Sequence, residues 1–101
     1  MKRKVHFEVT SSLGKKIKTT AGYWQKIVRT KHPAMQGKEE LVKSTLTTAE
    51  QVRRSRKDPS VSLYYKKHES RYCCVVVKHL NGDGFVVTTY MTDRIKVGEV
   101  V

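Results

Sequence analysis

The chain has 101 residues, of which 21 are lysine or arginine and 9 are aspartate or glutamate, so that its net charge is +12 and its pI is near 10.0. This length suits one domain with a single core and excludes two independent cores. The charge attracts polyanions, which makes nucleic acid the leading class of partner and an acidic protein the second, with charge kept for solubility as the third interpretation.

The N-terminus is basic, but no apolar run of about ten residues follows it, so we expect neither a signal peptide nor a membrane segment and predict a cytoplasmic protein. Cys73 and Cys74 are adjacent in a strand-like run, where their side chains point to opposite faces. They are interpreted as reduced packing residues. No metal-ligand spacing is present, so we expect no metal and no cofactor.

The first half of the chain predicts a strand, a short edge strand and a helix. Residues 4–10 alternate apolar and polar side chains, and residues 16–19 pair back on them as a lysine-bearing edge strand. Thr20 is the predicted N-cap of a helix over residues 21–30 with one apolar face. Pro33 ends this helix at His32, because the residue before a proline disfavours helical geometry.

A second short helix is predicted over residues 37–46, with Glu39 paired to Lys43 one turn later. The pattern then changes to four strands, around residues 52–56 and starting at 61, 71 and 85, with a turn of helix and a short last strand in residues 92–101. The predicted fold class is α+β: N-terminal strands and two short helices packed on a four-stranded antiparallel sheet.

The turn signal at residues 81–84 predicts a hairpin with a four-residue loop, which pairs Leu80 with Phe85. In this register Thr88 and Tyr90 share a face with Val75 and Val77. A bulge at one of the loop glycines would shift the register by one residue and exchange the faces. Both faces are apolar, so we expect one to lie under the helices and the other to form a partly covered groove.

Metal-free RNA cleavage needs a base for the 2′-hydroxyl, a donor or cation for the phosphorane, and an acid for the departing 5′-oxygen. DNA lacks the 2′-hydroxyl, so this route selects RNA. The chain offers a catalytic set and a set of cations that could bind RNA. The catalytic candidates are His32, Arg53, Arg54, Ser55, Tyr65, Thr88 and Tyr90, and the binding candidates are Lys31, Arg56, Lys66, Lys67, Arg71 and Lys78.

Each candidate has a structural alternative. A histidine at a helix end can simply interact with the last carbonyls, and the arginines can form a solvated or phosphate-binding strip. Thr88 and Tyr90 are also ordinary strand residues. Tyr64 and Tyr65 point to opposite faces, so one is expected in the core and the other is available to stack on a base. The other histidines, His6, His68 and His79, are expected to be structural.

The segments YWQKIVRTKHP, VRRS, YYKK, YCCVVVK, GFVVTTY and IKVGE together resemble the barnase, EndoU, colicin and RelE-like group of small bacterial and phage nucleases, over about residues 15–100. The resemblance is to single-domain members with a KHP motif and a closing V-T-x-Y strand. It implies a metal-independent ribonuclease, often the toxin of a toxin–antitoxin pair, with helices followed by a four-stranded antiparallel sheet. The matching positions are His32, Arg53, Ser55, Tyr64, Tyr65, Thr88 and Tyr90.

The chain departs from that pattern at Ala34 and Met35, where the family often has an acidic residue, and at Ala49, where it has a proline. If an acidic residue orients the histidine in active members, Glu39 or Glu40 would have to take its place, or activity would be reduced.

The first hypothesis is a small cytoplasmic endoribonuclease, a toxin with an acidic antitoxin, that cleaves free or ribosome-bound RNA. In it His32 is general acid or base, Arg53 or Arg54 stabilises the phosphorane, and Thr88 or Tyr90 positions the phosphate. The alternatives are a non-catalytic nucleic-acid-binding module on the same basic face, and an interaction protein that docks an acidic partner.

Overall fold

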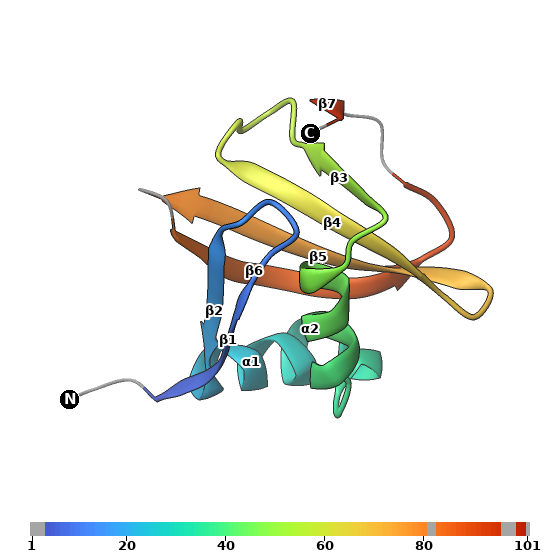
Figure 1. Cartoon of the computed structure of the whole chain (residues 1–101). Helices are drawn as coiled ribbons and strands as arrows, with labels where there is room; N and C mark the ends of the chain where they lie inside the picture. The colour runs from blue at the N-terminus through green and yellow to red at the C-terminus, as the bar shows by residue number, and fades with distance from the viewer. Residues whose placement is uncertain (1–3, 81–82, 96–98, 101) are drawn as a thin grey trace.

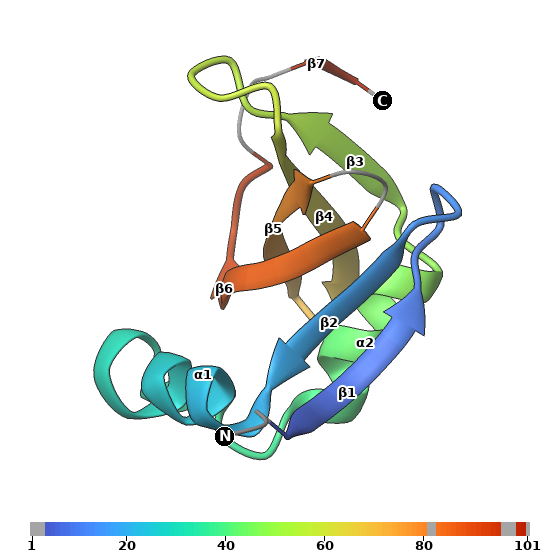
Figure 2. The same ribbon diagram turned by 90° about the vertical axis from the view of Figure 1, so that its left-hand side faces the viewer.

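The computed structural model describes residues 4–80, 83–95 and 99–100, which form one curved sheet with the helices on one side of it (Figures 1 and 2). Two short helical turns, η1 and η2, connect α1 to α2. The elements are β1 Val5–Thr10, β2 Lys16–Thr20, α1 Ala21–Lys26, η1 Ile27–Lys31, η2 Pro33–Met35, α2 Glu39–Thr47, β3 Gln51–Arg54, β4 Val61–His68, β5 Arg71–Leu80, β6 Asp83–Thr92 and β7 Glu99–Val100.

The strand order is β1-β2-β6-β5-β4-β3-β7, and every neighbouring pair is antiparallel except β2 and β6, which are parallel. The predicted α+β class is confirmed. The prediction of a four-stranded antiparallel sheet is wrong, because the N-terminal hairpin does not pack on that sheet but extends it through β2. Residues 16–20 are therefore an inner strand, and β1 is the edge at this end of the sheet.

The first helix begins where the sequence predicts and changes geometry before it ends. The Thr20 side-chain oxygen accepts a hydrogen bond from the Tyr23 backbone N–H at 3.1 Å, which is the predicted N-cap. From Ile27 the helix widens into the π-helical turn η1, closed by the His32 N–H donating to the Ile27 carbonyl at 2.8 Å. His32 has φ −143° and ψ 78°, so the helix ends there, before Pro33.

The main core lies between the helices and the face of the sheet that they cover, called here the inner face. Trp24 and Ile27 from the first helical segment meet Val42 and Leu46 from α2 and side chains such as Val75 from β5, all at most 1% exposed. Each such side chain contributes about 1.5–3 kcal/mol by leaving water. Among the described residues no helix is long and apolar enough to cross a membrane.

The β5–β6 hairpin differs from its predicted register. Leu80 pairs with Asp83 rather than Phe85, and one extra residue, Val87, forms a β-bulge between the two strands. The side chains of β6 before the bulge lie on the predicted faces of the sheet, and those after the bulge lie on the opposite faces from the predicted ones. Thr88 and Tyr90 therefore lie on the face away from the helices, called here the outer face, and their predicted place beside Val75 and Val77 is wrong.

Candidate active site on the outer sheet face

The outer face carries a second apolar cluster, which makes it a partly covered surface as the sequence predicts. Leu63, Tyr65 and Cys74 are at most 8% exposed, although no helix lies over them. Ile95, in the segment that follows β6, packs on this cluster, together with half-buried side chains that include Tyr90. Only side chains at the margins of this cluster are therefore accessible to a substrate.

His32 reaches that margin beside Tyr90. Strand β2 pairs only with the beginning of β6, so η1 and η2 can pack against the later part of β6. The His32 and Tyr90 ring centroids are 5.4 Å apart with an angle of 35° between the planes, and both residues are half-buried. The π-helical turn, and the end of the helix just before Pro33, thus place His32 beside Tyr90 on the outer face.

Tyr90 lies opposite Cys74 in the ladder. Burial raises the pKa of the Tyr90 phenol, and the neighbouring Cys74 thiol and Tyr65 raise it further. The phenol therefore stays protonated at neutral pH and can donate a hydrogen bond to an anion. An imidazole next to a neutral phenol can exchange a proton while the phenol holds an oxyanion in place.

Thr88 adds a further polar group to this end of the outer face. It pairs with Val76, and its hydroxyl is buried with no hydrogen-bond partner among the described residues. A buried hydroxyl without a partner is uncommon in proteins. The candidate site therefore consists of His32, Tyr90 and Thr88, over the Cys74 thiol.

The two candidate arginines lie on opposite faces of β3. Arg53 pairs with Leu63 on the outer face, and Arg54 lies on the inner face. The Arg53 guanidinium donates to the Gln51 Oε1 at 2.6 and 3.2 Å. Because β4 and β5 separate β3 from β6, adjacent strands about 4.8 Å apart place the β3 and β6 backbones about 14 Å apart, and Tyr90 is two residues beyond the β6 position that lies directly across from Arg53. The structure does not bring either arginine together with His32.

Ser55 follows β3 and organises a turn. Its hydroxyl oxygen accepts hydrogen bonds from the backbone N–H groups of Lys57 and Asp58 at 3.2 and 3.4 Å. This explains a serine at this position without any catalytic role.

The paired tyrosines face opposite ways, as predicted, but both are 0% exposed. Tyr64 lies on the inner face, where its hydroxyl donates to the Ser11 Oγ at 3.0 Å, and burial raises the pKa of its phenol. Tyr65 is enclosed in the outer cluster. The expectation that one of the two is available to stack on a base is therefore wrong.

The predicted RNA-binding cations divide into exposed residues and one structural residue. Lys66 is on the inner face and half-buried. Its Nζ donates to the Ser44 Oγ at 2.8 Å and to the Thr48 Oγ1 at 2.6 Å, in and just after α2, so its ammonium is already bonded within the protein. Exposed side chains are those of Lys31, Arg56, Lys67, Arg71 and Lys78. Arg71 pairs with Asp93 at 3.1 Å, and Lys78 with Asp58 at 3.5 Å.

The two candidates to replace the missing acid, Glu39 and Glu40, are bonded to side chains other than His32. The Glu39 carboxylate is 2.9 Å from the His6 Nε2, and this hydrogen bond is the main reason that the pKa of Glu39 is lowered. Glu40 pairs with Lys43 at 3.0 Å, in place of the predicted pair of Glu39 with Lys43. His6 ties β1 to α2 and stacks on a buried tryptophan, which is the structural role expected for it.

Two residues near the site were missed by the sequence reasoning. Tyr23 belongs to the apolar face of the predicted first helix, but its hydroxyl also donates to the carbonyl of the bulge residue Val87 at 3.0 Å. Cys74 was interpreted as packing alone, although its thiol contacts the Tyr90 phenol. Both contacts depend on where the bulge lies in β6. The sequence does not show the position of the bulge, because residues 86–89 are all β-branched.

Among the described residues, no three His, Cys, Asp or Glu side chains gather closely enough to hold a metal ion. No protein-family model, curated protein or solved structure matches the chain.

Proposed function

We propose that the protein is a metal-independent endoribonuclease that cleaves RNA through attack of the 2′-hydroxyl, and that it acts in the cytoplasm as the toxin of a toxin–antitoxin pair with an acidic partner. The observation that carries this proposal is the position of the His32 imidazole, 5.4 Å from the Tyr90 ring at the uncovered margin of the outer face. The net charge of +12 supports a polyanionic substrate.

In the proposed reaction a proton leaves the 2′-hydroxyl, the 2′-oxygen attacks the adjacent phosphorus, and the 5′-oxygen departs as an alcohol after it gains a proton. The products are a 2′,3′-cyclic phosphate and a 5′-hydroxyl. His32 serves as the acid or base, because histidine is the side chain that exchanges protons most readily near neutral pH. The Tyr90 phenol donates a hydrogen bond to a phosphoryl oxygen, and the Thr88 hydroxyl, which is buried in the free protein, would have to turn toward the substrate to add a second one.

The cations then bind the substrate on either side of the cleaved bond. Arg53, on a strand about 14 Å across the sheet from β6, is assigned to a more distant phosphate and not to the phosphorane. Lys67 and Arg71 are exposed at the ends of β4 and β5 that lie nearest to the end of β6. They would hold the backbone without reading its sequence.

The test is incubation of the purified protein with 5′-labelled single-stranded RNA in EDTA. We expect cleavage to a 2′,3′-cyclic phosphate and a rate about 10²–10⁴-fold lower in His32→Ala. His68→Ala is the matched control, since His68 is exposed and pairs with its neighbour Glu69 at 3.3 Å. A single 2′-deoxynucleotide in the RNA should block cleavage at that position.

If neither free RNA nor ribosome-bound message is cleaved, or if His32→Ala cleaves as fast as the parent protein, the enzymatic proposal is refuted.

A second candidate function is non-catalytic RNA binding by the same face. One observation favours it: Glu39 and Glu40 are bonded to His6 and Lys43, so neither orients the His32 ring as a catalytic carboxylate would. This alternative predicts RNA binding that weakens steeply with salt and is the same in His32→Ala, with the RNA left intact.

A further inference from the structure

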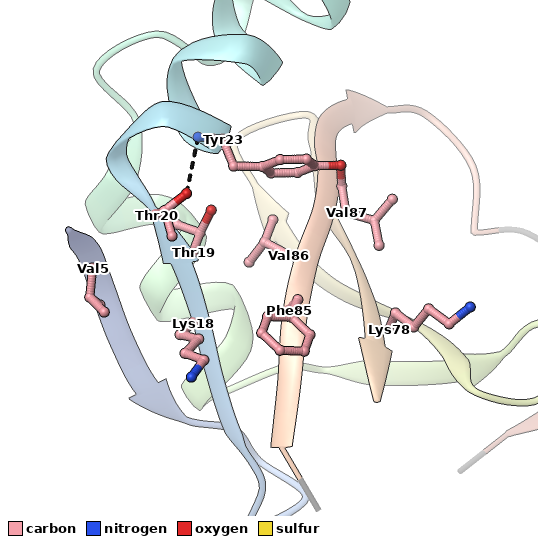
Figure 3. Close-up of a pocket in the computed structure, with 9 residues that line it drawn as sticks. All are labelled: Val5, Lys18, Thr19, Thr20, Tyr23, Lys78, Phe85, Val86 and Val87. Atoms are coloured by element: carbon pink, nitrogen blue, oxygen red, sulfur yellow. Dashed lines mark hydrogen bonds between the residues drawn. The ribbon is translucent and has the colours of Figure 1, made fainter. Parts of the chain in front are cut away.

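A groove of about 490 Å³ lies where β2 and β6 separate, beside the candidate active site (Figure 3). Val5 of β1, Phe85 and Val87 of β6 and Tyr23 of α1 supply most of its apolar lining, and Lys18 and Lys78 flank Phe85. Its volume is within the range of about 300–1,000 Å³ that is usual for pockets that hold a ligand.

The groove is built into the fold. Strand β2 pairs with β6 only over residues 16–18 and 83–85, and beyond this the two strands diverge. The N-cap at Thr20 turns the chain into α1, and the Tyr23 hydroxyl crosses the gap to the Val87 carbonyl. These two hydrogen bonds fix the opening and close one end of it.

The lining is unusually apolar for an uncovered surface. Val5 is 53% exposed and Phe85 is 42% exposed, and these are two of the three large apolar side chains that are most exposed in the described part of the chain. Exposed apolar side chains with a polar rim are also found in binding grooves. The Lys18 ammonium, 5.5 Å from the centre of the Phe85 ring, places positive charge directly at this surface.

We infer that the groove binds an extended acidic segment of a partner protein, with its apolar side chains in the groove and its carboxylates on Lys18 and Lys78. The inference shares an acidic partner with the proposed function, but it does not depend on RNA cleavage, so the two can fail separately. Positive charge at the rim selects acidic side chains, and the net charge of +12 would speed their approach.

Two observations favour a peptide over a nucleobase. The Thr20 and Tyr23 hydroxyls of the groove are already bonded, which leaves the Thr19 hydroxyl as the neutral side-chain group of the lining that could read the edge of a base. The divergent part of β2 is not paired with β6, so an extended peptide could hydrogen-bond to its backbone. The Thr19 hydroxyl, which also lines the groove, is buried with no partner among the described residues and could be satisfied by such a backbone.

The probe is a fluorescein-labelled nine-residue peptide with phenylalanine and valine at alternate central positions and glutamates on both sides. Its control is the same peptide with serine in place of the two apolar residues. Fluorescence anisotropy with the full chain should show at least about tenfold tighter binding of the apolar peptide, equivalent to about 1.4 kcal/mol.

The variants Phe85→Asp and Val5→Asp should each remove this preference. Leu80→Asp is the matched control, because Leu80 is 48% exposed and does not line the groove. Lys18→Glu should weaken binding of both peptides more than Lys26→Glu, which makes the same charge change on the exposed side of α1. All five positions are at least partly exposed, and circular dichroism will confirm that the variants are folded.

Equal binding of the two peptides, or an apolar preference that survives in Phe85→Asp, would overturn the inference. It would also be overturned if oligouridylate RNA bound to the parent protein but not to Phe85→Asp while the acidic peptide failed to bind.

Discussion

Adjacent lysines on β4 provide a direct comparison of a structural cation with one that we propose to bind RNA. Lys66 points to the inner face, where its ammonium bonds to the hydroxyls of Ser44 and Thr48. Lys67 points to the outer face and is exposed. We therefore expect Lys66→Met to lower stability with little effect on RNA binding, and Lys67→Met to do the reverse.

The magnitudes follow from these environments. A hydrogen bond to a charged group contributes about 1.5–3 kcal/mol, and because Lys66 is partly exposed we take about 1.5 kcal/mol for the two bonds together. For a domain of this size the corresponding fall in Tm is roughly 6–12 °C. Methionine keeps most of the apolar stem, so this loss belongs to the ammonium. Lys67→Met should change stability by less than about 0.5 kcal/mol.

The assays are thermal unfolding followed by circular dichroism, and binding of single-stranded oligouridylate at several salt concentrations. For single-stranded RNA, each phosphate contact adds about 0.7 to the slope of log K against log salt concentration. Lys67→Met should reduce that slope by about this amount, and Lys66→Met should leave it unchanged.

The reasoning is refuted if Lys66→Met has the parent Tm, or if it is Lys66→Met that reduces the salt slope. Either result would mean that the Lys66 ammonium is not held by α2. An unchanged slope in Lys67→Met would remove Lys67 from the proposed RNA contacts without affecting the structural half of the prediction.

Two further predictions concern packing and pH. A Cβ at Gly84 would lie 2.6 Å from the Ile17 Cδ1 and 2.9 Å from the Val77 Cγ1, so Gly84→Ala should cost about 1–3 kcal/mol of unfolding free energy in urea titrations, and a variant as stable as the parent would contradict this close approach. The hydrogen bond from His6 lowers the pKa of Glu39, so the stability from this carboxylate is complete above its ordinary value of 4.5 and is lost as pH falls through the lower folded value. Between pH 5 and 3 the parent protein should lose more stability than Glu39→Gln, and parallel losses would refute the assignment.

The positions of the elements could be predicted from local patterns. The alternation in residues 4–10 and the turn signals of the second half located the strands to within a few residues. Thr20 as N-cap and the stop before Pro33 were also confirmed, because capping and pre-proline sterics act over three or four neighbouring residues. The sequence by itself thus determined the α+β class and the break at His32.

Only the tertiary structure decided which side chains meet. The bulge at Val87 moves Thr88 and Tyr90 to the outer face, and one extra residue in a run of β-branched side chains leaves no periodic signal. The burial of Tyr65 under Ile95 depends on a segment that is distant in sequence, and so do the contacts of Lys66 with α2. The alternation of side chains follows from the geometry of a single strand. Strand register and the covering of a face depend instead on contacts between segments far apart in the chain. The His32–Tyr90 pair and the groove beside Phe85 could therefore be identified only from the tertiary structure.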